Sequence, residues 1–238
     1  MLESIFNKFD LKIPLAVAIV YAQSVNVKDS PEEFKQMITH LCEGIRSKNQ
    51  SGDGDNNSDP SKQSIRALLK FGKYRATGRG KPASEYLYNL AREQGAINFI
   101  NNIVDANNFI SLKHQLPISI FDLDQCTPPL TIRHGLLGER YIFNQSGQDI
   151  DLQDLLLVAD SANNSSRAIG NPIKDSMATK VFASQTAATT EAKNVLGVIY
   201  ANKEVTTKTT LTEAASEFAL TLTRFAGATT TETQLFGY

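Results

Sequence analysis

The chain has 238 residues, of which 41% are hydrophobic and 21% charged, a composition typical of a folded globular protein rather than a disordered one. Its formal net charge of −1 excludes a protein that coats nucleic acid without selectivity, because such binding depends on neutralising many phosphates. Cys42 and Cys126 cannot build a disulfide framework or a zinc site, and they favour a reducing, cytoplasmic location. We expect neither a metal nor a cofactor.

The first half of the chain predicts one strand followed by helices. Residues 13–21 read as a buried strand, and the apolar run around them is too short to span a bilayer. Ser30 and Glu33 flank Pro31 in the pattern of a capping box, which begins a helix that runs to about Ile45. Further helices are expected over residues 62–71 and 82–94.

Residues 48–59 form an acidic stretch between the first two predicted helices. The stretch is rich in turn-forming residues, which predicts a mobile surface loop. Asp53 and Asp55 begin it like a calcium-binding loop, but Ser58 and Ser64 stand where that loop requires glycine and glutamate. The calcium interpretation therefore fails.

The second half alternates helices with short strands. A helix over residues 102–113 places Asn101, Asp105 and Asn108 on one polar face. Pro117 then precedes a strand over 118–121, and a hairpin is expected over 130–143 with two glycines in its turn.

Buried strands at 154–160 and 194–201 precede a final helix that stops at Gly227. The sequence contains no internal repeat and no linker of the length that separates domains. This order predicts a single α+β domain over residues 1–238, with helices packed on one side of largely antiparallel sheets.

Two carboxylates, Asp122 and Asp124, follow the strand over 118–121 and could share one face of it. Paired carboxylates suggest acid–base or metal chemistry. An aspartate at a strand end commonly caps a turn instead, and we favour that structural role.

A basic segment runs from Arg66 to Lys81 without an acidic residue. Phe71 and Tyr74 stand among its charges as possible stacking surfaces for bases. A run of like charge is as readily a solvated surface, so both interpretations stay open. The spacing of its glycines matches neither of the common phosphate-binding loop motifs.

Four motifs follow one another along the chain: RATGRGKPASEYL from Arg75, VDANNFISL from Val104, LPISIFDLD from Leu116 and IRHGLLGE from Ile132. In this order they resemble the editing domain of the bacterial phenylalanyl-tRNA synthetase β chain, of which freestanding relatives exist. The resemblance is strongest over residues 75–200. It implies a three-layer α+β domain, with a β-sandwich of unusual topology and helices on one side, as in a domain of tRNA lysidine synthetase.

In the synthetase this domain hydrolyses tyrosine wrongly esterified to tRNA, so the resemblance implies tRNA or aminoacyl-tRNA as partner. An aminoacyl ester is already activated, and such a site needs chiefly to position a water and stabilise an oxyanion. The implied roles are water and ester positioning for Asn108 and Ser119, substrate binding for Asp105, Asn107, Gly170 and Asn171, and tRNA binding for Lys73, Arg75, Arg79 and Lys81.

Two departures from the family pattern bear on activity. Ser119 replaces a histidine of the family, and residues 194–201 contain no acid where the family reads the tyrosine hydroxyl with a glutamate. Tyrosine specificity is therefore unsupported. We expect a freestanding tRNA-binding protein that hydrolyses misacylated tRNA in trans. The alternatives are a non-catalytic module that binds tRNA or an amino-acid-like ligand, and a scaffold that retains only the core.

Overall fold

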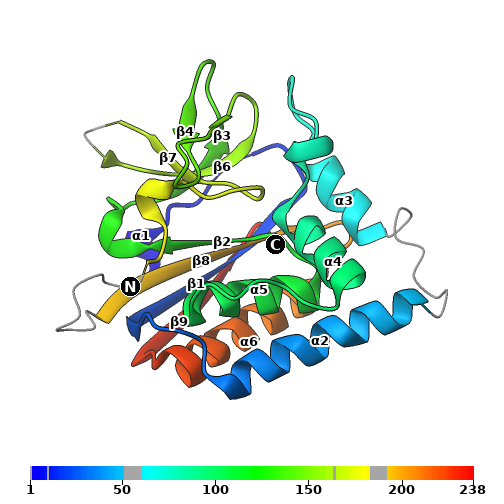
Figure 1. Cartoon of the computed structure of the whole chain (residues 1–238). Helices are drawn as coiled ribbons and strands as arrows, with labels where there is room; N and C mark the ends of the chain where they lie inside the picture. Colours follow the sequence, from blue (N-terminus) through cyan, green and yellow to red (C-terminus); the bar gives the residue numbers. More distant parts are fainter. Residues whose placement is uncertain (1, 10, 51–59, 163–164, 183–191) are drawn as a thin grey trace.

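The computed structural model describes residues 2–9, 11–50, 60–162, 165–182 and 192–238. It is a mixed α+β fold in layers, with a four-stranded antiparallel sheet of order β2-β8-β1-β9 in the middle. Helices α2, α5 and α6 cover one face of this sheet, and a smaller sheet of order β3-β6-β7 lies on the other (Figure 1). In the described residues no helix is long and apolar enough to cross a membrane.

The helices are α1 (Leu2–Ile5), α2 (Glu32–Gln50), α3 (Pro60–Leu68), α4 (Ala83–Gln94), α5 (Asn102–His114) and α6 (Lys208–Ala226). The strands of the large sheet are β1 (Leu15–Asn26), β2 (Ile118–Asp122), β8 (Ala192–Asn202) and β9 (Thr230–Phe236). The remaining strands are β3 (Thr131–His134), β4 (Arg140–Ile142), β5 (Asp149–Asp151), β6 (Leu156–Asp160) and β7 (Arg167–Gly170).

Strand β1 is apolar without alternation because both of its faces are covered. Its residues Leu15 to Ala22 are all buried, and it pairs with β8 on one side and β9 on the other. The predicted strands over 13–21, 118–121 and 194–201 are confirmed, and β1 extends five residues beyond its predicted end. The edge strand β9 has no counterpart in the prediction, because its first five residues are all polar and carry no apolar signal.

The helical layer is fixed by aromatic contacts and by a glycine. Phe34 of α2 stacks on Phe225 of α6 at a centroid distance of 4.2 Å. Gly197 of β8 makes room for Phe218 of α6, since a Cβ at this position would lie 2.6 Å from the Phe218 ring. The final helix and its stop at Gly227, which has φ of +69°, are confirmed.

Helix α2 begins within one residue of its predicted start, but its predicted capping box and its predicted end are wrong. The Ser30 hydroxyl donates to Oδ2 of Asp105 at 2.6 Å, and Glu33 pairs with Arg224, so neither side chain belongs to a capping box. The helix continues to Gln50, which places residues 48–50 of the predicted acidic loop in its last turn. The rest of that loop, 51–59, lies outside the described residues.

The predicted hairpin over residues 130–143 is also wrong. Strand β3 pairs with β6, whereas β4 pairs with β5. The chain diverges at Gly135, where a Cβ would lie 1.8 Å from the Leu152 carbonyl oxygen, so only glycine permits this close crossing. Arg133 at the end of this crossing donates to both carboxylate oxygens of Glu139 at 2.7 Å.

Asp122 and Asp124 have structural roles. Asp122 ends β2 and accepts a hydrogen bond from the backbone N–H of Asp124 at 3.2 Å, while its other oxygen pairs with Lys193. Asp124 accepts hydrogen bonds from the backbone and side chain of Asn194 at 3.2 and 3.1 Å. The capping role is confirmed, and because Asp124 lies in the 3-10 turn η2 (Leu123–Gln125), the two carboxylates do not share a strand face.

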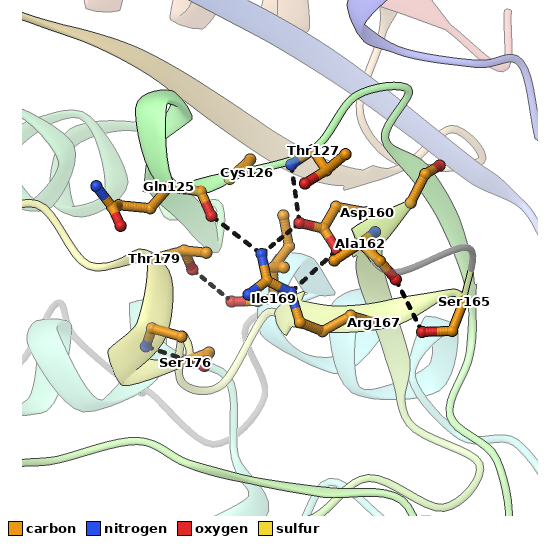
Figure 2. Close-up of polar contacts among 12 residues, drawn as sticks. Gln125, Cys126, Thr127, Asp160, Ala162, Ser165, Arg167, Ile169, Ser176 and Thr179 are labelled. Carbon is orange, nitrogen blue, oxygen red and sulfur yellow. Dashed lines mark hydrogen bonds and ion pairs between the residues drawn. The ribbon is translucent and has the colours of Figure 1, made fainter.

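An ion pair with a buried carboxylate joins the smaller sheet to the turn that follows β2. Figure 2 shows Arg167 of β7 between the Asp160 carboxylate and the Gln125 carbonyl, with hydrogen bonds of 2.5 and 3.0 Å from Nη2. Asp160 also accepts from the backbone N–H of Thr127 at 3.0 Å. One fully buried carboxylate thus links β6, β7 and the segment that leaves the large sheet.

Candidate functional site

A cavity of about 550 Å³ lies where α5, β2, the β4–β5 turn and the segment after β7 meet. This volume is within the usual range for small-molecule sites. Apolar and polar side chains both line it: Ala83, Ile100, Val104, Asn107, Asn108, Ile118, Ile120, Asn144, Gln145, Ser146, Asn171, Ile173, Lys174, Asp175, Met177, Lys180, Val181 and Phe182.

Helix α5 contributes one face to the cavity. Val104, Asn107 and Asn108 lie at i, i+3 and i+4, so their side chains share that face. The three side chains of the predicted polar face, Asn101, Asp105 and Asn108, point to different surroundings instead of sharing the cavity. Asn101 caps the helix by accepting from the N–H groups of Ile103 and Val104, and of the three only Asn108 lines the cavity.

Asp105 is engaged elsewhere. Its carboxylate accepts from the Ser30 hydroxyl at 2.6 Å and from the Ile100 N–H at 2.9 Å. Burial raises its pKa, although these two hydrogen bonds oppose the shift. Asp105 therefore ties α5 to the start of α2, and it is not among the residues that line the cavity.

Strand β2 divides its side chains between the cavity and the interior. Ile118 and Ile120 line the cavity, so the alternation of a strand directs Ser119 to the opposite face. Ser119 is fully buried there, with its hydroxyl 3.2 Å from the Asn171 carbonyl oxygen and 3.1 Å from the Tyr200 hydroxyl. Ser119 thus supports the cavity wall from behind.

The segment after β7 is shaped by Asn171. Its side-chain oxygen accepts from the N–H groups of Ile173 and Lys174 at 2.8 and 3.0 Å, and its amide nitrogen contacts the Tyr141 hydroxyl. Gly170 does not line the cavity, but a Cβ at this position would lie 2.3 Å from Oδ1 of Asp175. Gly170 therefore leaves the space that the Asp175 carboxylate occupies.

Asp175 is one of the cavity residues that sequence reasoning missed. Its Oδ2 accepts from the Ile120 N–H at 3.1 Å, whereas Oδ1 is buried and has no hydrogen-bond partner among the described residues. Burial raises the pKa of Asp175 to about 7. Nothing in the sequence distinguishes it from other loop aspartates, because its environment exists only once the loop closes over β2.

Positive charges gather at the same cavity. Burial lowers the pKa of Lys174 and Lys180, and the nearby charge of Arg79 lowers that of Lys174 further. The Lys180 ammonium donates to the Phe143 carbonyl, and the Lys174 ammonium lies 3.8 Å from the centroid of the Phe143 ring. Both lysines therefore hold the β4–β5 turn against the segment after β7.

The basic segment lies beside the cavity, where the charge of Arg79 lowers the pKa of the lining residue Lys174. Lys73 and Arg79 are exposed and Lys81 is half-buried, at the start of a helix whose first residue, Ala83, lines the cavity. The Arg75 guanidinium instead donates to the carbonyls of Gly72 and Tyr74 at 2.8 and 2.7 Å.

The described residues contain no group of three or more His, Cys, Asp or Glu side chains that could hold a metal ion.

The sequence model of the B3/4 domain family matches residues 73–223, a stretch that contains every residue of the cavity lining. The chain is 35% identical over 82 residues to the phenylalanine–tRNA ligase beta subunit of Streptococcus pneumoniae, which covers 33% of this chain and 10% of that protein. An N-terminal fragment of the Pyrococcus horikoshii phenylalanyl-tRNA synthetase beta subunit aligns at a TM-score of 0.41 and 17% identity, over 56% of this chain and 41% of the fragment. The chain spans about a tenth of the length of the curated relative.

Proposed function

Because the chain belongs to the B3/4 domain family, we propose that its cavity binds the aminoacylated end of a tRNA and that the protein hydrolyses the ester of a misacylated one. The observation that carries this proposal is the position of Asn108. The family resemblance implies a pocket role for this residue, and its side chain lines a cavity of about 550 Å³, which supports that role. The curated relative is named as a ligase for phenylalanine and tRNA, which supports tRNA as the partner.

The cavity residues suit the hydrolysis of an ester without a covalent nucleophile. The Asn108 amide offers both donors and an acceptor, which can orient a water against the ester carbonyl. The ammonium groups of Lys174 and Lys180 supply positive charge for the developing oxyanion. In this scheme Ser119 positions the wall behind β2 and does not touch the substrate.

A panel of mischarged tRNAs tests the proposal. The purified protein should deacylate at least one of them faster than buffer does. Asn108→Ala should lower kcat/KM by about 100-fold, the cost of losing one well-placed hydrogen-bond donor. Asn98→Ala, which replaces an exposed asparagine outside the cavity, is the matched control and should leave the rate unchanged. If no tRNA in the panel is deacylated, hydrolysis is excluded.

The second candidate is a non-catalytic module that binds the same end of tRNA. The buried Ser119 hydroxyl favours it, because that group is held by Asn171 and Tyr200 and cannot serve as a base. Binding of aminoacyl-tRNA without turnover, measured with the same panel, would select this candidate.

Basic side chains beside the cavity should set the affinity for tRNA. Arg79→Gln and Lys174→Gln should each weaken binding and reduce the slope of log K against log salt by about 1. Arg75→Gln should have a smaller effect, because its guanidinium is held by carbonyls of its own loop. Arg46→Gln on α2, which lies in the helical layer, is the control (Figure 1). Unchanged binding by all three variants of the basic groups would contradict a tRNA-binding cavity.

A further inference from the structure

We propose that Asp175 and Asn107 form a subsite for the free α-ammonium group of an aminoacylated nucleotide, so that the cavity accepts unblocked aminoacyl groups and rejects N-acylated ones. This inference rests on the proposed function and names the chemical group that the site reads.

Two unsatisfied acceptors carry the inference. Oδ1 of Asp175 and Oδ1 of Asn107 are both buried and lack a hydrogen-bond partner among the described residues, and both residues line the same cavity. Buried acceptors are rarely left unpaired, because each costs the free energy of its lost hydration. A ligand that supplies several donors would satisfy both, and an ammonium group carries three.

Both acceptors are held in place by their surroundings. The Ile120 N–H binds the other oxygen of Asp175, and Gly170 leaves room for Oδ1. Asn107 is 8% exposed, and its amide nitrogen lies 3.4 Å from the side-chain oxygen of Asn108. One N–H of the Asn107 amide is thereby engaged, and the amide oxygen is left for the ligand.

The remaining lining fits the other parts of such a ligand. Lys174 and Lys180, with Arg79 close to Lys174, provide the positive charge that a phosphodiester requires. Apolar side chains of α5 and β2, including Val104 and Ile118, line the same space. An aminoacylated nucleotide has an ammonium group, a phosphate and, for apolar amino acids, a hydrophobic side chain, so the cavity matches it in all three.

The charges around Asp175 predict how binding depends on pH. Hydrogen bonds from Ser119 and the Ile120 N–H and the charge of Lys180 favour the carboxylate, while Tyr141 and Tyr200 face it from other elements. Burial raises the pKa of both tyrosines well above 10, so they stay neutral. Asp175, with a pKa of about 7, must be ionised and the ligand amine, with a pKa of about 7.7 to 8.0, must be protonated. Binding should therefore be strongest between these two values.

The test uses puromycin 5′-phosphate, in which an amide joins an aminoacyl group with a free amine to a nucleotide, and its N-acetyl derivative. Titration calorimetry with the full chain at pH 7.5 should show the N-acetyl form binding at least about 30-fold more weakly, the effect of leaving a buried charge unpaired. Asp175→Asn should bring the two affinities together. Asp151→Asn, at an exposed carboxylate on β5, should keep the discrimination.

Equal affinity of the wild-type chain for the two compounds would overturn the ammonium subsite, and so would failure of both to bind. The comparison of two ligands on the wild-type chain needs no variant to fold. Deacylation of mischarged tRNA is measured separately. The ammonium subsite can therefore be disproved while deacylation is observed, and deacylation can be absent while the subsite is confirmed.

Discussion

Asp160→Ala should lower the free energy of unfolding by about 3 kcal/mol, because it leaves the Arg167 guanidinium without its buried partner. The Asp160 carboxylate is fully buried and binds Arg167 through two hydrogen bonds and the Thr127 N–H through another (Figure 2). Removing it disconnects β6 and β7 from the turn after β2. Arg167 still reaches water through its exposed side, which places the loss at the lower end for buried pairs.

Urea unfolding followed by circular dichroism measures this loss. Asp149→Ala is the matched control, since Arg140 and Asp149 form the same kind of two-bond pair with side chains 50% and 48% exposed. Breaking that pair should cost less than about 1 kcal/mol. Equal losses in the two variants would show that burial does not determine the contribution of these pairs.

Asp175→Asn should make the protein progressively more stable than wild type as the pH rises from about 4 to 7. In the unfolded chain the carboxyl ionises near pH 3.9, whereas in the folded protein burial holds its pKa at about 7. Between these values the folded state binds more protons than the unfolded state. Stability therefore falls with rising pH, by about 1.4 kcal/mol per unit for this group alone.

Urea unfolding at pH 4.5, 5.5, 6.5 and 7.5 measures the difference between wild type and Asp175→Asn, which cancels the contribution of other titrating groups. The difference should grow steadily up to about pH 7 and then level off. Asp151→Asn shows the effect of losing a carboxylate at the surface of β5. A constant difference for Asp175→Asn would mean that the carboxylate is not held in a buried environment.

Hydrophobic periodicity predicted the elements that need only some apolar surface to pack against. The apolar run of β1 and the spacing of Leu211, Phe218 and Leu222 in α6 required only a hydrophobic surface to pack against, and both predictions are confirmed. The hairpin failed because strand partners depend on a long-range crossing at Gly135. The capping-box prediction is wrong because the Ser30 hydroxyl donates to Asp105, which lies 75 residues away in the sequence.

The same distinction applies to the site. Motif resemblance identified Asn107, Asn108 and Asn171, all of which line the cavity, but it could not show that Asp105 and Ser119 face other partners. Asp175, Lys174 and Lys180 join the cavity through the path of the segment after β7 and through contacts with the β4–β5 turn. That path is set by tertiary packing, which local patterns do not encode.

The space at Gly170 limits how this cavity can diverge among related sequences. Any side chain at position 170 would collide with both the Asp175 carboxylate and the Phe121 ring, because a Cβ would lie 2.3 Å from Oδ1 and 2.4 Å from the ring. Relatives that keep the acid and the aromatic ring should therefore keep the glycine, and relatives with a larger residue at the position of Gly170 should differ at both of the other positions. The three positions should vary together, and a change of the acid should mark a relative with a different ligand.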